Sequence, residues 1–299
     1  MFVKSERALS DFSGRFSLVV RDCRFHTIGK IPTRIEGRLV PVGGKKFLRE
    51  LSEDMDGIAG VICTPDVVKS IPPELGCAVS DAPMRVAYEI HRELVAGPAF
   101  WKSFASRIHA SAQIHPTAYI APNDVVIGEG TVVGPNVSIL ERTVIGKHCY
   151  FGPGTVIGGP AYEVSNLDGR PQLLPQAGGV RIGDHCTFLA NVAVAKSIFP
   201  LFTEIGEACS FDNLVHVAHD CVLGRGVKMT ACAILSGRVT LMDGAYIGPN
   251  ATVSNGVTVG KNAIVTIGSV VVKDVAEGAR VTGNFAIDHR KHLRRQAAD

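Results

Sequence analysis

The sequence predicts a mainly β protein whose second half is a coil of short, stacked parallel strands. Three observations support this prediction: an apolar residue returns at every sixth position over long runs, Gly is frequent at 32 of 299 residues, and aromatic residues make up only 6% of the chain. Neither a helix nor a single strand has a period of six, but a chain that turns a corner every six residues does. Three such sides would close a triangular coil of about 18 residues, and roughly eight coils would stack along residues 108–275.

The longest run of the repeat starts at residue 205. Every sixth residue from there is apolar, so we expect these side chains to point into the coil. The fifth position of each six-residue side usually holds a small or β-branched residue, and it holds Cys149, Cys186, Cys209 and Cys221. We therefore expect these cysteines to be small buried side chains rather than nucleophiles or metal ligands. The run itself consists of Ile205, Phe211, Val217, Leu223, Met229, Leu235, Leu241, Ile247, Val253, Val259, Val265 and Val271.

Residues 1–104 lack the repeat and predict a small α/β domain. Short apolar runs bounded by turn residues favour strands, and longer amphipathic stretches favour helices. The expected strands are 18–21, 38–42 and 57–63, and the expected helices are 47–53 and 84–94.

The coil domain is expected to span residues 105–287, with one long loop extruded from it. The repeat fails over 158–181, where three Pro and five Gly stand among polar residues. A loop of this length in a compact fold is usually functional or disordered. A shorter break covers 197–204. Residues 288–299 form a basic tail that is expected to be a short exposed helix.

The composition excludes several classes of protein. With 31 Lys+Arg against 28 Asp+Glu, the net charge of +3 gives no reason to expect nucleic-acid binding. Eight cysteines are too few for a disulfide scaffold in a chain of 299 residues, and no pair has CxxC spacing. Residues 1–10 hold no apolar signal-peptide core, and no run of about 18 apolar residues could span a membrane. We therefore expect a cytoplasmic protein without a membrane span.

The richest chemical signal is the segment from His216 to Cys221, which reads HVAHDC. In the six-residue frame the valine of this segment points inward, so His219 stands near a corner and is expected to face outward. One coil later the chain has Gly237, whose backbone N–H would be open beside the imidazole. This pairing suits acyl transfer, because an imidazole can take a proton from the attacking group and an N–H can stabilise the oxyanion. Asp220 would orient the imidazole or tune its charge.

Five segments carry a resemblance to a known family. They are GVICTPD, VSDAPMRVAYEIHREL, IHPTAYIAP, LLPQAGGVRIGD and FDNLVHVAHDCVLG, and they run through nearly the whole chain. These segments resemble the UDP-3-O-acylglucosamine N-acyltransferases of lipid A biosynthesis. The resemblance implies a left-handed parallel β-helix of hexapeptide repeats, with His219 as the catalytic base and the N–H of Gly237 as the oxyanion hole. The HVAHDC segment is similar in the sister O-acyltransferases, but the N-terminal domain favours the N-acylating branch.

The resemblance also implies ligands. The acceptor would be the amine of a nucleotide-linked amino sugar of the UDP-glucosamine type. His216, Asn213 and Phe47 would bind this acceptor, with Phe47 stacking on the nucleobase. The acyl donor would be a thioester of acyl carrier protein or coenzyme A, held near Asn255 and Gly256. No cofactor would be bound permanently.

Two positions depart from the family. Pro41 replaces an aromatic residue that accompanies the one at Phe47, and Val257 replaces a histidine that helps to hold the donor. The segment from Gly268 to Ala286 instead resembles the ending of coenzyme A-dependent sugar N-acetyltransferases. The nucleotide, the acyl chain and its carrier therefore stay open.

A coil with three flat faces and one reactive histidine predicts a homotrimer, because a partner's wall would enclose the substrate. For the N-acyltransferase we expect no metal. Two other functions stay open beside it. One is an O-acyltransferase of the lipid A type. The other is a non-catalytic or metal-binding scaffold, in which His216, His219 and His185 would bind a metal between subunits.

Overall fold

The computed structural model describes residues 2, 5–31, 33–97, 100–167, 169–283, 285 and 290. The basic tail predicted over 288–299 lies, apart from residue 290, outside the described residues. The chain divides into two compact units. The first unit contains Met1–Ala105, Pro160–Gly179 and Lys196–Phe202, and the second contains Ser106–Gly159, Val180–Ala195 and Thr203–Asp299.

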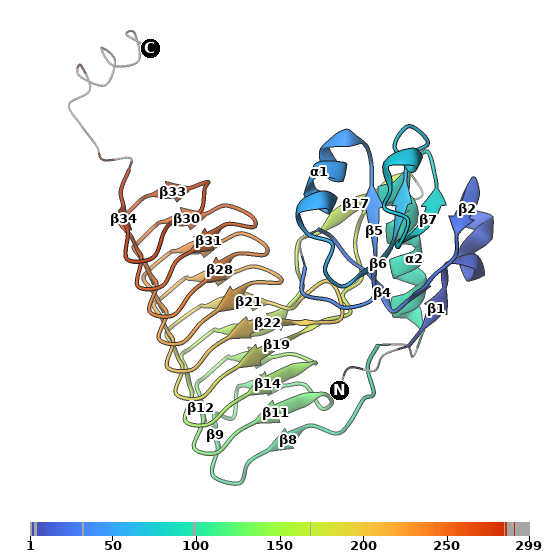
Figure 1. The fold of residues 1–299 in the computed structure, drawn as a ribbon. Coiled ribbons are helices and arrows are strands. Elements are labelled where there is room, and N and C mark those ends of the chain that lie inside the picture. Colours follow the sequence, from blue (N-terminus) through green and yellow to red (C-terminus); the bar gives the residue numbers. More distant parts are fainter. Residues whose placement is uncertain are drawn as a thin grey trace. The chain divides into compact units, whose positions relative to one another are not determined.

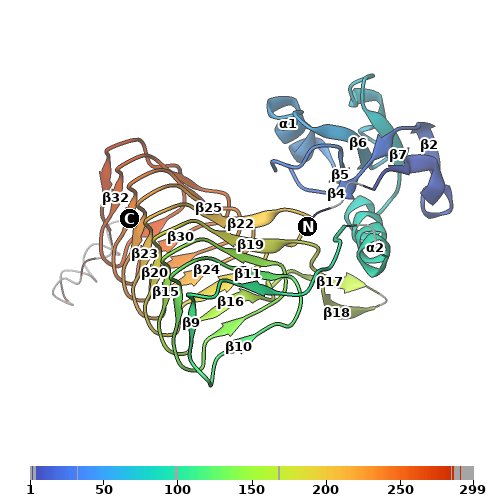
Figure 2. The same cartoon turned by 90° about the horizontal axis from the view of Figure 1, so that it is seen from below.

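The second unit is the left-handed parallel β-helix that the sequence predicts. Its short strands form three parallel sheets, and Figures 1 and 2 show the coils stacked along one axis. The first sheet holds β10 (Tyr119–Ile120), β13 (Ser138–Ile139), β16 (Val156–Gly159), β21 (Ala193–Ala195), β24 (His216–Val217), β27 (Ile234–Leu235), β30 (Thr252–Val253) and β33 (Val270–Val271).

The other two sheets complete the triangular coil. With eight, eight and nine strands among the described residues, the three sheets match the roughly eight coils expected from the repeat. The second sheet holds β8 (Arg107–Ile108), β11 (Val125–Ile127), β14 (Thr143–Ile145), β19 (Gly179–Ile182), β22 (Phe202–Ile205), β25 (Val222–Leu223), β28 (Thr240–Leu241) and β31 (Thr258–Val259). The third holds β9 (Gln113–Ile114), β12 (Val132–Val133), β15 (Tyr150–Phe151), β20 (Thr187–Phe188), β23 (Ser210–Phe211), β26 (Lys228–Met229), β29 (Tyr246–Ile247), β32 (Ile264–Val265) and β34 (Arg280–Val281).

The repeat forms the core of the coil. All twelve apolar residues of the long run are buried, as the six-residue frame predicts. The side chains of successive coils stack directly, and the rings of Phe151, Phe188 and Phe211 lie nearly parallel with centroids 4.8 and 4.5 Å apart. Parallel stacking at this spacing follows from the distance between hydrogen-bonded strands. The four cysteines at the fifth position of their hexads are buried as well, which confirms that prediction.

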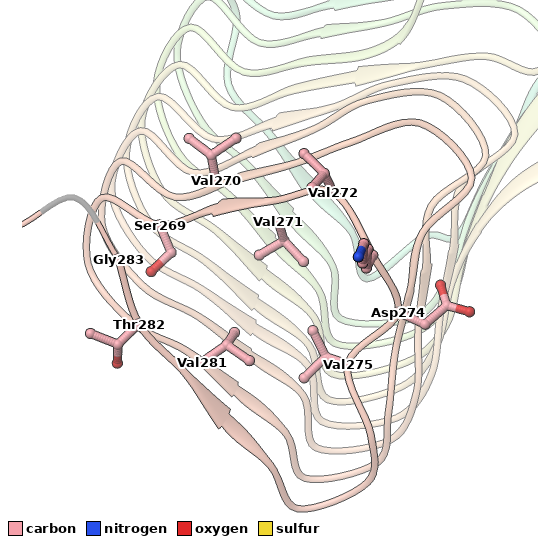
Figure 3. A pocket seen from close by; sticks show the side chains of 10 residues that line it. Ser269, Val270, Val271, Val272, Asp274, Val275, Val281, Thr282 and Gly283 are labelled. Carbon is pink, nitrogen blue, oxygen red and sulfur yellow. The ribbon is translucent and has the colours of Figure 1, made fainter. Parts of the chain in front are cut away.

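The last coil encloses a cavity of about 300 Å³, which is lined by residues 269–275 and 281–283. Figure 3 shows Val271, Val275 and Val281 pointing toward one another into the interior of the coil. None of the predicted site residues lines this cavity. It is the exposed end of the core.

The first unit is built on a five-stranded sheet in the order β2-β7-β6-β5-β4. Strands β4 to β7 are parallel and β2 is antiparallel to β7. The unit also has two α-helices, two 3₁₀ helices and the antiparallel pair β1–β3 among its described residues. Its elements are β1 (Arg7–Ala8), η1 (Leu9–Arg15), β2 (Leu18–Arg21), β3 (Arg24–Phe25), β4 (Thr27–Ile28), β5 (Arg38–Val42), α1 (Lys45–Glu53), β6 (Ile58–Cys63), η2 (Val68–Ser70), β7 (Gly76–Val79) and α2 (Pro83–Ala96).

The predicted strands and helices of this unit are present. β2 and β5 have the expected bounds, β6 begins one residue later than expected, and both helices are slightly longer. Strands β4 and β7 were not predicted from the sequence. β4 has only two residues, and β7 contains Gly76 and Ala78, which have low strand propensity, so no run of strand-forming residues marks either one.

The long break in the repeat contains a β-hairpin rather than an irregular loop. Its strands are β17 (Val164–Leu167) and β18 (Arg170–Leu173), and they pair antiparallel. The turn includes Gly169 with a φ of 74°, which glycine adopts without strain. The Asp-Gly pair of the sequence is a known hairpin signal that our prediction did not use.

The hairpin segment belongs to the first unit and packs on α2 (Figure 2). The carboxylate of Glu163 accepts hydrogen bonds from Lys30 Nζ and from the hydroxyl of Tyr88, both at 2.6 Å. Farther along the same helix, the Nε2 atom of His91 lies 2.8 Å from the carbonyl oxygen of Pro175. The segment is therefore tied to the unit at both of its ends.

No helix among the described residues is long and apolar enough to cross a membrane.

Candidate active site

The centre of the site is the pair His219 and Asp220, which follows β24 at a corner of the coil. His219 Nδ1 lies 2.8 Å from Asp220 Oδ2. A carboxylate in this position fixes the ring and favours the tautomer with its proton on Nδ1, which leaves Nε2 free to accept a proton. The carboxylate also stabilises the imidazolium that forms when Nε2 takes up a proton.

The imidazole of His219 is less accessible to solvent than we expected from its place at a corner. Its residue is only 7% exposed, and Asp220 is 9% exposed. The hydrogen bond to Asp220 holds the imidazole along the wall of the coil, where the corner of the next coil covers it. The six-residue frame identifies the side of the strand on which a residue stands, but it does not describe what lies above it.

Gly237 is the residue that covers the imidazole. A Cβ atom at this position would lie 2.5 Å from Cε1 and 2.6 Å from Nε2 of His219, closer than any side chain tolerates. The backbone N–H of Gly237 donates no hydrogen bond to another described residue. The sequence therefore predicted the neighbour of His219 correctly, and only glycine allows this approach.

The backbone around the pair is fixed by the adjacent coils. The N–H of Asp220 donates to Thr203 Oγ1 at 3.0 Å, and the carbonyl of His219 accepts from the N–H of Arg238 at 2.9 Å. Asp220 and Arg238 both have a positive φ, near 60°, which is uncommon for these residue types. The two residues occupy equivalent corners of consecutive coils.

His216 lies on β24 and points away from the core. It is exposed, and its strand neighbours are Ala193 on one side and Ile234 on the other. The pKa of His216 is lowered below its ordinary value, first because the coil wall removes part of its hydration and second because of the charge on His219. A neutral imidazole offers one donor and one acceptor to a ligand on this wall.

The two other residues predicted to bind the acceptor have structural contacts. Asn213 accepts a hydrogen bond from the N–H of Ala190 at 3.0 Å and donates one to Asp212 at 2.8 Å, so its amide supports the turn. Phe47 is partly buried against the core of the first unit. It stands on a different compact unit from His219.

The two residues predicted at the donor site lie on the corner one coil beyond Gly237. Gly256 has open space where a side chain would stand. Asn255 is exposed, and its Nδ2 lies 3.2 Å from the position that a Cβ of Gly237 would occupy. Its Oδ1 accepts a hydrogen bond from Arg238 Nη2 at 2.8 Å. Arg238 was not predicted as a site residue, because the sequence does not show which side chains meet across coils.

The metal-binding alternative would place His216, His219 and His185 on a metal between subunits, an arrangement that one chain alone does not contain. His185 stacks on His148, with ring centroids 5.2 Å apart. Within the described ranges, no group of three or more His, Cys, Asp and Glu side chains is arranged to hold a metal ion.

The chain is similar in sequence to known bacterial acyltransferases. A family model described as bacterial transferase hexapeptide (six repeats) matches residues 124–159. The chain is 35% identical over 113 residues to the UDP-3-O-acylglucosamine N-acyltransferase of Hydrogenovibrio crunogenus, a match that covers 36% of this chain and 32% of that protein. It is 39% identical over 165 residues to the protein of the same name from Maricaulis maris, covering 55% and 47%. The expected resemblance is confirmed. The chain spans less than half the length of these relatives.

A solved structure shows the same fold. The UDP-N-acetylglucosamine acyltransferase from Campylobacter jejuni aligns with a TM-score of 0.51 and 23% identity, over 65% of this chain and 81% of that one. At this level of identity the likeness concerns the β-helix and not the substrate.

Proposed function

We propose that the protein is an N-acyltransferase that moves an acyl group from a thioester to the amine of a nucleotide-linked amino sugar. The observation that carries this proposal is the His219–Asp220 pair beneath Gly237. In this arrangement the imidazole is the base, and a backbone N–H without a hydrogen-bond partner among the described residues, that of Gly237, lies next to it. Acyl transfer needs both groups.

The proposed reaction starts with the neutral amine of the sugar. Its nitrogen attacks the carbonyl carbon of the thioester while Nε2 of His219 takes a proton from it. The electron pair of the carbonyl moves to oxygen, and the N–H of Gly237 stabilises the resulting charge. When the carbonyl re-forms, the carbon–sulfur bond breaks and the leaving thiolate takes the proton from the imidazolium. The products are an amide and a thiol, and His219 is again neutral.

The names of the relatives and the first unit support the nucleotide-sugar acceptor. Both relatives are UDP-3-O-acylglucosamine N-acyltransferases, which implies a UDP-linked amino sugar as in lipid A biosynthesis. In this proposal His216 contacts the sugar and Phe47 stacks on the nucleobase. The hydrogen bonds of Asn213 favour a role in the turn over a direct substrate contact.

The acyl donor is acyl carrier protein or coenzyme A, used as a co-substrate and not bound permanently. Gly256 leaves room for its chain at the corner beyond Gly237. We further propose that the protein is a homotrimer, with the site closed by the wall of a neighbouring subunit. The exposed apolar side chains of Leu214 and Ile234 near His216 support this, because a partner would shield them from water.

The test is an acyl-transfer assay with purified protein. It offers UDP- and dTDP-linked amino sugars beside their hydroxyl counterparts, each with acyl-coenzyme A and with acyl carrier protein thioesters. The proposal predicts amide formation and thiol release with an amino sugar. Turnover of the hydroxyl sugars alone would establish an O-acyltransferase instead. Absence of turnover with every pair would contradict the proposal.

A further inference from the structure

We infer that the side-chain amide of Asn255 is a second hydrogen-bond donor to the oxyanion, and that Arg238 is the positioning residue that orients it. This inference rests on the proposed function and assigns Asn255 a role in the chemical step rather than in holding the acyl donor.

The first observation is that two polar atoms converge on one point. That point is the position a Cβ of Gly237 would occupy, which the glycine leaves free for the imidazole of His219. His219 Nε2 lies 2.6 Å from it and Asn255 Nδ2 lies 3.2 Å from it. The imidazole, the backbone of Gly237 and the amide of Asn255 therefore border the same small region, and a substrate oxygen bound next to it would lie within reach of all three.

The second observation is that Arg238 decides which end of the amide faces this point. A guanidinium can only donate hydrogen bonds, so the atom that accepts from Arg238 Nη2 at 2.8 Å must be the oxygen of Asn255. The amide is planar, which leaves its N–H₂ end toward His219. The Nδ2 atom makes no hydrogen bond to another described residue, so its N–H groups are open to a ligand.

The backbone holds Arg238 in place for this role. Its N–H donates to the carbonyl of His219, so the arginine belongs to the coil directly above the imidazole. Its Nε is buried without a hydrogen-bond partner among the described residues, while its Nη2 donates the hydrogen bond to Asn255. The positive guanidinium also polarises the amide and makes its N–H a stronger donor.

An amide that can only donate fits an oxygen that gains charge. In the proposed reaction the carbonyl electron pair moves to oxygen during attack and returns when the thiolate leaves. The N–H of Gly237 and that of Asn255 would both donate to this oxygen while it is charged. Two donors are stronger than one, and a donor that is already oriented needs no rearrangement when the charge forms.

The test compares Asn255→Ala with the wild-type protein in the acyl-transfer assay. We expect kcat to fall about 100- to 1,000-fold, the loss typical of one oxyanion donor. The KM values for acceptor and donor should change by less than about threefold, because the contact forms only in the transition state. Asn255 is exposed, so the fold should persist, and circular dichroism would check this. An unchanged kcat, or a change in KM alone, would overturn the inference.

Two further variants separate the roles of the residues. Arg238→Met should lower kcat roughly 10-fold, because the amide stays but loses its orientation. It should add little to Asn255→Ala in the double variant, since Arg238 acts through Asn255; an additive loss would refute the positioning role. The matched control is Arg225→Met, an exposed arginine at another corner, which should keep normal kcat.

Asn255→Asp gives a readout that a structural role would not move. A carboxylate beside His219 favours the imidazolium and raises the pKa of the base, so the rising limb of the pH–rate profile should shift to higher pH. An unshifted limb would contradict the proposed proximity of the two side chains. Wild-type protein without any acyl transfer would instead refute the proposed function and this inference together, which distinguishes the two failures.

Discussion

At the scale of residues, the site depends on close approaches that the coil imposes. His219 lies next to Gly237 because positions 18 residues apart stand on the same corner of consecutive coils, and the adjacent Asp220 holds the imidazole by a hydrogen bond of 2.8 Å. The repeat therefore predicted that Gly237 stands next to His219. It did not predict that His219 is buried or that Arg238 reaches Asn255, because both depend on side-chain direction and not on register.

A first prediction concerns Gly237→Ala. The new Cβ would lie within 2.6 Å of two imidazole atoms, so the ring of His219 must move. We expect acyl transfer to fall by at least about 100-fold, because a displaced base no longer reaches the amine. Steady-state kinetics would measure this. Gly14→Ala is the control, since nothing lies within 4 Å of its added Cβ and its backbone is not in the left-handed region, so it should retain activity. Equal activity of both variants would contradict the geometry.

A second prediction concerns the titration of His216. Its pKa lies below the ordinary value, mainly because of desolvation and partly because of the charge on His219. The change His219→Gln removes this charge, so the pKa of His216 should rise but remain below that of a free imidazole. An NMR titration of the His216 ring in both proteins would measure the two values. A fall, or no change, would show that the rings do not interact.

At the scale of elements, the coil is built from short strands that stack on one another. Each strand of the coil has only two to four residues, and the parallel ladders with the coils above and below hold it in place. The period of six made this part of the fold predictable. Strand β4 was missed because it has only two residues, β7 because glycine and alanine weaken its strand signal, and the hairpin β17–β18 because its Asp-Gly turn signal was not used.

A third prediction concerns the stack of phenylalanine rings in the core. Phe188 lies between two other rings and is fully buried, so Phe188→Ala should reduce the free energy of unfolding by about 3–5 kcal/mol. Urea denaturation followed by circular dichroism would measure this loss. Tyr150→Ala serves as the comparison, because this residue lies on the neighbouring strand with an exposed side chain and should cost less than about 1 kcal/mol. Similar losses in both variants would contradict a core made by stacked inward residues.

At the scale of the whole molecule, we expect the active site to be completed by a second copy of the chain. A fourth prediction is that the protein is a trimer in solution, because a single flat wall of the coil cannot enclose an acyl chain and a sugar. Analytical ultracentrifugation should give three times the mass of the chain, 31.8 kDa. A fully active stable monomer would refute this arrangement.

The most direct test of the central claim is the acyl-transfer rate of protein without the imidazole at residue 219. His219→Ala should lower kcat/KM for the amino sugar by about 100- to 10,000-fold, the usual contribution of a general base. His219 is buried, so His219→Gln is measured beside it, because glutamine nearly fills the same space and separates lost chemistry from lost packing. Circular dichroism would confirm that both variants are folded. Both folded variants should lose acyl transfer; turnover within about threefold of wild type in either one would show that His219 is not the base.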